Sequence, residues 1–463
     1  MTLTDAAVPE LAPPELARPR RFRGRLSLRQ FLITIQKNSI ATWPEEAFEQ
    51  EFWDRRMLWK RTFVANSPEA VRHVLLDNQE NYVKTDIARR LLEPGLGRGL
   101  LTAEGDVWRR QRRLMAPAFQ HRRVVDFAGP IAAAAGRLAQ EWETVRGDFD
   151  IAHAMSGLTL AVISEIMFST AVDPRIALIG AGVDTYQTSI RPTLVDLLGL
   201  PAWLSRAGAK RAAAAFAQAD EVIAELIARR QAAADPGSDL LGLLIAKPET
   251  GEPPLSPREI RDQVATIFTA GHETTANALA WTWYLLALHP AVEKRLHDEL
   301  DAVLGDRGLG GRLPTFEDVA RLRYARMVID EAMRLYPPAH TMSRQALAED
   351  RIVGHRVPRG STVFIVPWLL HRHRKLWQDP EVFDPERMAP ERAADRPRFA
   401  YIPFGAGPRI CIGASLAITE AVLILATLAR TWRLRLAEGA RVEPIGLITL
   451  RPRGGLSMRL ERR

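Results

Sequence analysis

The chain of 463 residues has one cysteine, Cys411, in the run Phe404-Gly405-Ala406-Gly407-Pro408-Arg409-Ile410-Cys411-Ile412-Gly413. A lone thiol makes neither an intrachain disulfide nor a four-cysteine metal site. Its surroundings nevertheless suit a thiolate held against a ligand, because the two glycines before the sulfur and the one after it let the backbone approach a flat object. Arg409 adds a fixed cation two residues away, which favours the thiolate and can bind an anionic group.

A buried, inert cysteine and the nucleophile of a hydrolase are the two other interpretations of this thiol. Nothing near Cys411 is similar to a nucleophile elbow, whereas all fixed positions of F-x-x-G-x-R-x-C-x-G are present together. This pattern resembles the haem-binding loop of the cytochrome P-450 superfamily, the haem-thiolate monooxygenases. The resemblance implies that Cys411 is the axial iron ligand of haem b (iron protoporphyrin IX), with Phe404, Gly407, Arg409 and Gly413 around the cofactor. A thiolate ligand favours O–O cleavage.

A second polar run, Ala270-Gly271-His272-Glu273-Thr274-Thr275, interrupts an apolar stretch. Glycine inside a helix costs about 1 kcal/mol relative to alanine, and buried Glu273 and Thr274 cost more unless they are hydrogen-bonded. The run resembles the family's A-G-x-D/E-T-T signature. That resemblance implies a helix opened at Ala270 and Gly271 beside the iron, with Thr274 and Glu273 as catalytic residues. Thr274 would hydrogen-bond bound dioxygen and Glu273 would relay protons; a packing glycine and a Thr274 bond to a helix carbonyl are the alternative.

Two further segments predict a charge network. Glu331 and Arg334 are three residues apart, so they share a face of the predicted helix. The resemblance implies that Arg387, in Asp384-Pro385-Glu386-Arg387-Met388, joins this pair in a buried structural network. Met388 departs from the aromatic residue often found in the family at its position.

The segment Trp108-Arg109-Arg110-Gln111-Arg112-Arg113 is similar to the family's W-x-x-x-R helix. By that resemblance Trp108 and Arg112 contact the haem propionates, assisted by Arg409 and Arg344, because the planar guanidinium donates two hydrogen bonds to a carboxylate. The remaining arginines are expected to face solvent. They form either a docking patch for an acidic electron donor or a merely solvated basic face.

The elements that must position these residues are mostly helices. Ser256-Pro257-Arg258-Glu259 is a capping box with proline at the first helical position. It predicts a helix that runs to His289-Pro290, about 32 residues or roughly 48 Å at ~1.5 Å per residue. Its second half is apolar nearly all round, so we expect it to be buried.

Other segments complete a mainly α protein with a small β portion. Helices are predicted from Ser67-Pro68-Glu69 onward, over 131–145 and over 212–233, and strands at 59–65, 362–366 and within 447–460. This organisation agrees with the cytochrome P-450 fold. We expect a single large haem domain over residues 26–463, preceded by a Pro- and Arg-rich segment, residues 1–25, that is disordered.

Composition narrows the function classes. The net charge is +8 with a pI near 9.9, yet no nucleic-acid motif accompanies it. Genome-wide arginine bias is the alternative explanation for this charge.

No signal-peptide core precedes the domain, and no window reaches ~18 uninterrupted apolar residues. The longest apolar stretch is Thr274 to Leu288. We therefore expect a soluble, cytoplasmic, bacterial-type protein without a membrane anchor, monomeric by default.

The resemblance implies a monooxygenase that inserts one atom of dioxygen into an apolar organic substrate. No flavin or iron–sulfur domain is recognisable, so electrons are expected one at a time from a ferredoxin- or flavodoxin-type donor with its reductase. A peroxygenase, an isomerase or dehydratase of hydroperoxides, and a haem-binding sensor are the alternatives. The Glu273-Thr274 pair argues against the first two.

The residues expected to line the pocket are Ile267, Ala270, Thr274, Ala339 to Met342, Leu447 and Ile448, with Arg89 to Leu101 and Tyr186 to Trp203 at its entrance.

Overall fold

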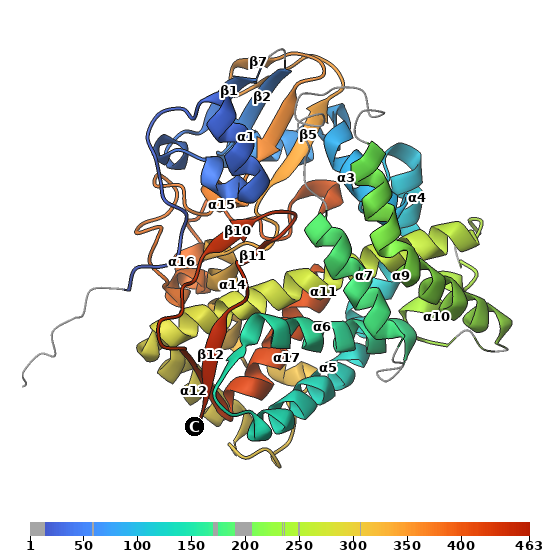
Figure 1. Ribbon diagram of the computed structural model, residues 1–463, viewed down its shortest axis with the longest axis vertical. Helices are drawn as coiled ribbons and strands as arrows, with labels where there is room; N and C mark the ends of the chain where they lie inside the picture. Colours follow the sequence, from blue (N-terminus) through green and yellow to red (C-terminus); the bar gives the residue numbers. More distant parts are fainter. Residues whose placement is uncertain are drawn as a thin grey trace, which may run out of the picture.

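The computed structural model describes residues 14–57, 60–169, 175–189, 206–233, 235, 237–248, 251–305 and 307–463. Helices make up most of the molecule, while strands gather in small sheets, the largest at one end (Figure 1). The α-helices are α1 (Leu28–Lys37), α2 (Pro68–Arg72), α3 (Asp86–Leu96), α4 (Gly105–Met115), α5 (His121–Glu141), α6 (Ile151–Phe168), α7 (Ile176–Ser189), α9 (Arg206–Ala232), α10 (Leu240–Ile245), α11 (Pro257–Leu288), α12 (Pro290–Leu304), α13 (Phe316–Val319), α14 (Arg323–Leu335), α15 (Pro367–Leu370), α16 (Pro390–Ala393) and α17 (Ala414–Ala429). The mainly α class is confirmed.

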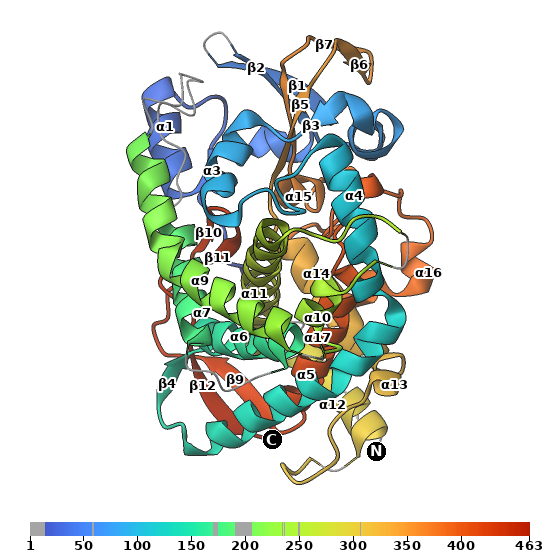
Figure 2. The ribbon, with the colours of Figure 1, turned by 90° about the vertical axis from the view of Figure 1, so that its right-hand side faces the viewer.

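The long central helix is α11, with 32 residues as predicted. The Ser256 hydroxyl accepts the Glu259 backbone N–H at 3.3 Å, and Glu259 Oε2 accepts the Ser256 N–H at 2.8 Å, which completes the capping box. Helices α3, α6, α9, α12, α14 and α17 all pack against α11. Viewed almost along its axis, α11 lies in the middle of the molecule (Figure 2). Because it is enclosed by other helices, a polar residue on it must find its partner on a neighbouring element.

The strands are β1 (Phe52–Met57), β2 (Lys60–Ala65), β3 (Tyr82–Val83), β4 (Asp148–Asp150), β5 (Met342–Ala346), β6 (Asp350–Ile352), β7 (His355–Val357), β8 (Thr362–Ile365), β9 (Trp432–Leu436), β10 (Pro444–Gly446), β11 (Leu450–Pro452) and β12 (Ser457–Arg462). The largest sheet has the order β1-β2-β8-β5-β3, with β2 and β8 parallel and the other pairs antiparallel. In its register Arg344 of β5 lies opposite Val363 of β8. Strand β5 thereby gives Arg344 a rigid base.

A hairpin near the C-terminus also matters for the site. Strands β10 and β11 pair antiparallel, and residues 447–449 form the tip between them. The Leu450 N–H donates to the Pro338 carbonyl at 2.9 Å, and the Trp281 indole N–H of α11 donates to the Leu450 carbonyl at 3.3 Å. These bonds fix the hairpin beside the C-terminal half of α11.

The boundaries of several elements differ from the predicted ranges. Helix α5 begins well before residue 131, passes through Pro130, and ends at Glu141 in a short 3₁₀ turn. Helix α9 starts before the predicted 212–233 segment and ends one residue earlier, at Ala232. The helix opened by Ser67 continues as a single π-helical turn, η3 (His73–Asp77). Trp59, predicted as a strand residue, lies outside the described residues.

One described helix, α6, has the length and composition of a membrane span. Its 18 residues have a mean hydropathy of 1.5, and 56% of them are buried. It packs against α5 and α11 in the manner of a core helix. The apolar stretch singled out from the sequence, Thr274 to Leu288, is part of the enclosed helix α11 instead.

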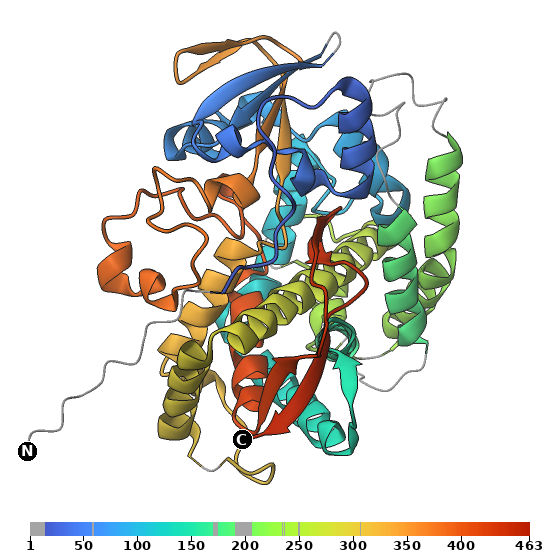
Figure 3. The same ribbon diagram turned by 60° about the vertical axis from the view of Figure 1, so that its left-hand side comes forward.

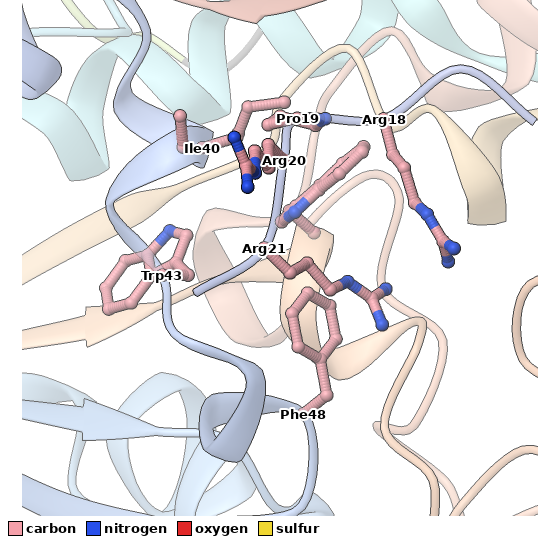
Figure 4. A pocket seen from close by; sticks show the side chains of 9 residues that line it. Arg18, Pro19, Arg20, Arg21, Ile40, Trp43 and Phe48 are labelled. Carbon is pink, nitrogen blue, oxygen red and sulfur yellow. The ribbon is translucent and has the colours of Figure 1, made fainter. Parts of the chain in front are cut away.

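Residues 14–25 make contacts that argue against disorder in this part of the predicted 1–25 segment; residues 1–13 lie outside the described chain. Leu16 is buried, the Ala17 N–H donates to the Tyr284 hydroxyl at 2.9 Å, and the Tyr336 hydroxyl donates to the Ala17 carbonyl at 2.8 Å. Figure 3 shows the segment in dark blue, running from the helices toward the large sheet. Farther along it, Arg21 lies with its guanidinium 4.0 Å from the centre of the Phe48 ring (Figure 4).

Candidate functional site

The loop around Cys411 is shaped by its backbone. The Cys411 N–H donates to the Phe404 carbonyl at 2.9 Å, which closes the turn. Gly405 and Gly407 have φ angles of +73° and +70°, a region that residues with a Cβ rarely adopt. A Cβ on Gly407 would also lie 1.8 Å from the carbonyl oxygen of Leu75 in η3. At Gly407 the structure thus shows a close approach to this chain's own backbone, which the sequence did not predict.

Gly413 has a different task from the other two glycines. Its φ of −88° is ordinary, and a Cβ there would only touch Phe119 at 3.9 Å. Its N–H donates a hydrogen bond to the Cys411 sulfur, directly before α17 begins. The backbone thus offers the sulfur a donor that favours its thiolate form.

The cation that acts on Cys411 is Arg112, not Arg409 as the sequence suggested. Removal from water raises the pKa of the Cys411 thiol, while the Gly413 N–H and the charge of Arg112 act in the opposite direction. Arg409 instead forms an ion pair with Glu104, and its guanidinium stacks 4.3 Å from the Trp108 ring centre. Residue Cys411 has exposed surface, although protein atoms surround its thiol densely.

A group of cations surrounds Arg409, which belongs to the same loop as Cys411. Burial, together with Arg409 and Arg344, lowers the pKa of Lys84 to about 7. Burial and Arg409 likewise lower the pKa of Arg344 to about 10, and its guanidinium donates to the Ser343 carbonyl at 3.0 Å. Glu104 is the acidic neighbour that acts on Lys84, Arg344 and Arg409. One carboxylate does not balance this charge, so the donor set fits a ligand with further carboxylates, as the haem propionates are.

Lys84 was not predicted from the sequence as a site residue. It follows strand β3, its N–H donates to Glu104 at 3.0 Å, and its ammonium donates to the Leu101 carbonyl. A single lysine in the segment Asn81 to Thr85 carries no recognisable pattern. Only the non-local approach of β3 to the cysteine loop shows it.

The other arginines of α4 are paired within the chain. Arg109 pairs with Asp106, Arg110 with Glu259 at the start of α11, and Arg113 with Glu252. Arg110 also donates to the carbonyls of Pro253 and Pro254. These contacts tether the segment before α11 and reduce the positive field that a docking patch requires.

The Ala270–Thr274 part of α11 differs from its surroundings in accessibility. Residues on both sides are buried, but Ala270 is exposed and Gly271 and Thr274 are half-buried. The α-helix is continuous here, so the structure does not show the local opening implied by the resemblance. The Thr274 hydroxyl donates to the Ala270 carbonyl at 2.6 Å, the helix bond that the sequence left as the alternative.

Glu273 and His272 turn away from that accessible face. The buried Glu273 carboxylate accepts the Thr449 hydroxyl at the hairpin tip at 2.7 Å, and Arg451 of β11 lies 3.9 Å from the same oxygen. His272 Nε2 lies 2.8 Å from the Ser156 hydroxyl of α6. His272 is therefore a buried polar residue between two helices, in keeping with the sequence interpretation that it is not an iron ligand.

A buried acid near the site was also missed. Glu420 is the single charged residue of α17, and burial raises the pKa of its carboxyl group to about 8. It hydrogen-bonds to Thr275 of α11. This contact brings α17, which begins directly after the cysteine loop, against the Ala270–Thr275 run. A lone acid in an otherwise apolar helix was the available signal.

The predicted charge network is assembled as a compact group. Arg334 donates to both carboxylate oxygens of Glu331 at 2.7 and 2.8 Å, with both side chains fully buried. The Arg387 Nε donates to Glu331 Oε1 at 2.9 Å. Arg334 further donates to the carbonyls of His371 and Pro380 at 2.8 and 2.7 Å. Because the guanidiniums donate hydrogen bonds both to the Glu331 carboxylate and to backbone carbonyls, the cost of burying these charges is offset.

The predicted pocket residues lie partly on accessible surface. Ile267 and His340 are buried, Thr341, Met342, Leu447 and Ile448 are half-buried, and Ala339 is exposed. At the predicted entrance, the buried Tyr186 hydroxyl donates to the Leu91 and Leu92 carbonyls at 2.8 Å. This joins α7 to α3. Residues 190–203 of the predicted entrance lie outside the described residues.

Comparison with known proteins identifies the family. Residues 32–455 match the cytochrome P450 family model. The chain is 39% identical to cyclooctat-9-en-7-ol 5-monooxygenase of Streptomyces melanosporofaciens (82% of this chain, 81% of the relative) and 32% identical to pentalenene oxygenase of Streptomyces avermitilis (87% and 88%). The crystal structure of the cytochrome P450DA heme domain superposes with a TM-score of 0.81 at 27% identity, covering 97% of this chain and 99% of that one. The chain belongs to the cytochrome P450 family and is a cytochrome P450 monooxygenase.

Proposed function

We propose that this monooxygenase inserts one atom of dioxygen into an apolar, cyclic terpene-type substrate. The observation that carries the proposal is the approach of the Cys411 loop, through α17 and Glu420, to the accessible Ala270–Thr274 face of α11. The names of the two Streptomyces relatives, which refer to cyclooctat-9-en-7-ol and pentalenene, support the substrate class. The half-buried apolar residues Leu447 and Ile448 are suited to such a compound.

The cofactor proposed for this site is haem b, with Cys411 as the iron ligand. When bound, haem supplies the oxygen chemistry, and the protein binds and orients the reactants. Phe404 and Gly407 shape the ligand loop, and the Gly413 N–H supports the thiolate. Ala270 and Gly271 provide a face of small residues on α11. Carboxylates of the cofactor are held by Arg112, Arg344, Arg409 and Lys84, while Trp108 keeps Arg409 in place. The Glu331, Arg334 and Arg387 network supports the loop structurally.

Thr274 and Glu273 are the proposed catalytic residues. The Thr274 hydroxyl donates to Ala270, so its oxygen can still accept a proton donor on the accessible side. Glu273 is adjacent in the chain and carries a carboxylate that can take up and release a proton. Together they deliver protons to the reacting oxygen.

Electrons are proposed to come from a separate ferredoxin- or flavodoxin-type protein with its reductase. The net charge of +8 supports an acidic partner, although the pairs made by Arg109, Arg110 and Arg113 mean that a donor must compete with internal carboxylates. Binding that weakens as salt rises is the expected signature. Residues 26–463 are proposed to form one haem domain of a monomeric, cytoplasmic protein.

The first test is the carbon-monoxide difference spectrum of the dithionite-reduced protein. A strongly red-shifted Soret band indicates thiolate-ligated haem. Cys411→Ser should remove that band, and Cys411→His should give the spectrum of a histidine-ligated haem. A wild-type protein that binds haem but shows the histidine-type band would overturn the ligand assignment. Pentalenene is then a suitable first substrate in a spin-state titration and a product assay.

A further inference from the structure

Glu273 is held by an element far from it in sequence. The hydroxyl of Thr449 donates to Glu273 Oε1 at 2.7 Å, and the guanidinium of Arg451 lies 3.9 Å from that oxygen. Asn277, one helical turn after Glu273, has its side-chain nitrogen 3.5 Å from the Thr449 hydroxyl oxygen. A carboxylate that accepts a hydroxyl hydrogen bond and has a guanidinium close to the same oxygen is fixed in its direction.

The exposed fractions of the two side chains show which of them is the more accessible. The Glu273 side chain is 11% exposed, whereas that of Arg451 is 28% exposed. Thr449, at the tip of the β10–β11 hairpin beside α11, is buried. Arg451 is thus the more accessible of the two charged partners, and Thr274, next in the chain after Glu273, borders the accessible face of α11.

The same hairpin carries part of the proposed substrate pocket. Leu447 and Ile448 directly precede Thr449, and the Leu447 carbonyl lies 3.1 Å from His340 Nε2. The hairpin is anchored at Leu450 by bonds to Pro338 and Trp281. A substrate that presses on the tip therefore presses on the donor of Glu273.

We propose that Thr449 and Arg451 are positioning residues that hold the Glu273 carboxylate for proton uptake at the Arg451 edge of the molecule. In each cycle a proton passes from solvent water to Glu273 and then toward Thr274, which regenerates the carboxylate. This inference rests on the proposed monooxygenase function and adds to it the entry side of the protons and its link to the substrate hairpin. Neither residue is required to touch the reacting oxygen.

The test compares Arg451→Gln, Arg451→Lys and Thr449→Val with the control Arg453→Gln. Arg453 lies on the same hairpin end but forms an exposed ion pair with Glu443. Oxygen consumption is driven by a ferredoxin and its NADPH reductase, with pentalenene as the probe, in H₂O and D₂O. For Arg451→Gln and Thr449→Val we expect a fall of roughly three- to ten-fold, below the 10²–10⁴-fold typical of losing an acid–base group itself. The solvent isotope effect should rise, Arg451→Lys should recover most of the rate, and Arg453→Gln should match the wild type.

Two double-variant measurements test whether Arg451 acts through Glu273. If Arg451 acts through Glu273, Arg451→Gln should cause no further loss of rate in a Glu273→Gln background. The shifts in the urea midpoint caused by Glu273→Gln and Arg451→Gln should likewise be non-additive, a readout that needs no turnover.

Rates and isotope effects of Arg451→Gln and Thr449→Val that equal those of Arg453→Gln would overturn the inference, as would full additivity with Glu273→Gln. Failure of the proposed function is recognised separately, because it would appear in the unmodified protein as a missing red-shifted carbon-monoxide band.

Discussion

Arg112 and Arg409 are both proposed to hold cofactor carboxylates, but their surroundings add a different role to each. Arg409 forms an ion pair with Glu104 and stacks on Trp108. Arg112 lies where its charge acts on the Cys411 sulfur. Because a charge matters most where it is neither paired nor screened, Arg112 has the larger influence on the thiolate although Arg409 is closer in sequence.

The Thr274 hydroxyl offers a direct test with an internal control. Thr274→Ala should retain haem and the red-shifted band but divert reducing equivalents from product to peroxide. Thr282 makes the same type of bond, from its hydroxyl to the Ala278 carbonyl at 2.7 Å, in a fully buried part of α11. Thr282→Ala should therefore leave the ratio of product to peroxide unchanged. Equal ratios in both variants and the wild type would reduce Thr274 to a helix-bonding residue.

Glu420 should make the stability of the protein depend on pH. Its pKa is raised to about 8 in the folded protein by burial, against about 4.3 in an unfolded chain. Between these values the unfolded state loses the proton that the folded state keeps. The free energy of unfolding therefore falls as pH rises, by up to about 1.4 kcal/mol per pH unit from this group.

Glu420→Gln removes this titration. In urea unfolding, the variant should gain stability relative to the wild type from about pH 5 to about pH 8, the window set by the two pKa values. Glu443→Gln, at an exposed ion pair with Arg453, is the control and should show no such trend. A constant difference between Glu420→Gln and the wild type would mean that Glu420 is ionised in the folded protein.

At the scale of elements, the approach of η3 to the cysteine loop is a structural requirement of the site. Gly407 combines a φ of +70° with a Cβ position 1.8 Å from the Leu75 carbonyl oxygen. Gly454 has a φ of +71° but no atom within 4 Å of its Cβ position. Substitutions at these two glycines therefore distinguish the cost of backbone strain from the cost of a steric clash.

Gly454→Ala should cost only the left-handed strain, about 1–2 kcal/mol of the free energy of unfolding. Gly407→Ala should cost more than ~3 kcal/mol, since strain adds to displacement of η3, and it should broaden or remove the red-shifted carbon-monoxide band. Urea unfolding and the difference spectrum measure both effects. Equal costs for the two variants would show that η3 can move away from residue 407 at little cost in stability.

The elements that could be predicted from the sequence are those with local signals. The bounds of α11 follow from Ser256, Glu259 and Pro290, which act within a few residues. The Glu331, Arg334 and Arg387 group was predicted through motif resemblance. The contact of Gly407 with Leu75 and the orientation of Glu273 toward Thr449 could not be predicted, because both join segments that are far apart in the chain and depend on tertiary packing.

For the molecule as a whole, the same reasoning applies to the N-terminal segment. Composition predicted disorder for residues 1–25, because proline and arginine bury little apolar surface. For residues 14–25 the structure shows contacts with a preformed surface instead: Leu16 is buried, and Ala17 bonds to Tyr284 of α11 and to Tyr336 after α14. Arg21 adds ion pairs with Glu45 and Glu381.

Deletion of residues 1–25 should therefore destabilise the protein more than deletion of residues 1–13 does. Losing the buried Leu16 side chain costs about 1.5–3 kcal/mol, and losing the two hydrogen bonds of Ala17 costs roughly 1 kcal/mol each. A lower urea midpoint for the longer deletion than for the shorter one is the expected result. Because Tyr284 and Tyr336 lie at the far end of α11 from its N-terminal cap, the longer deletion should also increase amide hydrogen exchange at the C-terminal turns of α11 before it affects Thr274. Identical midpoints for both deletions would show that residues 14–25 contribute no stability and that the prediction of disorder applies to the whole segment.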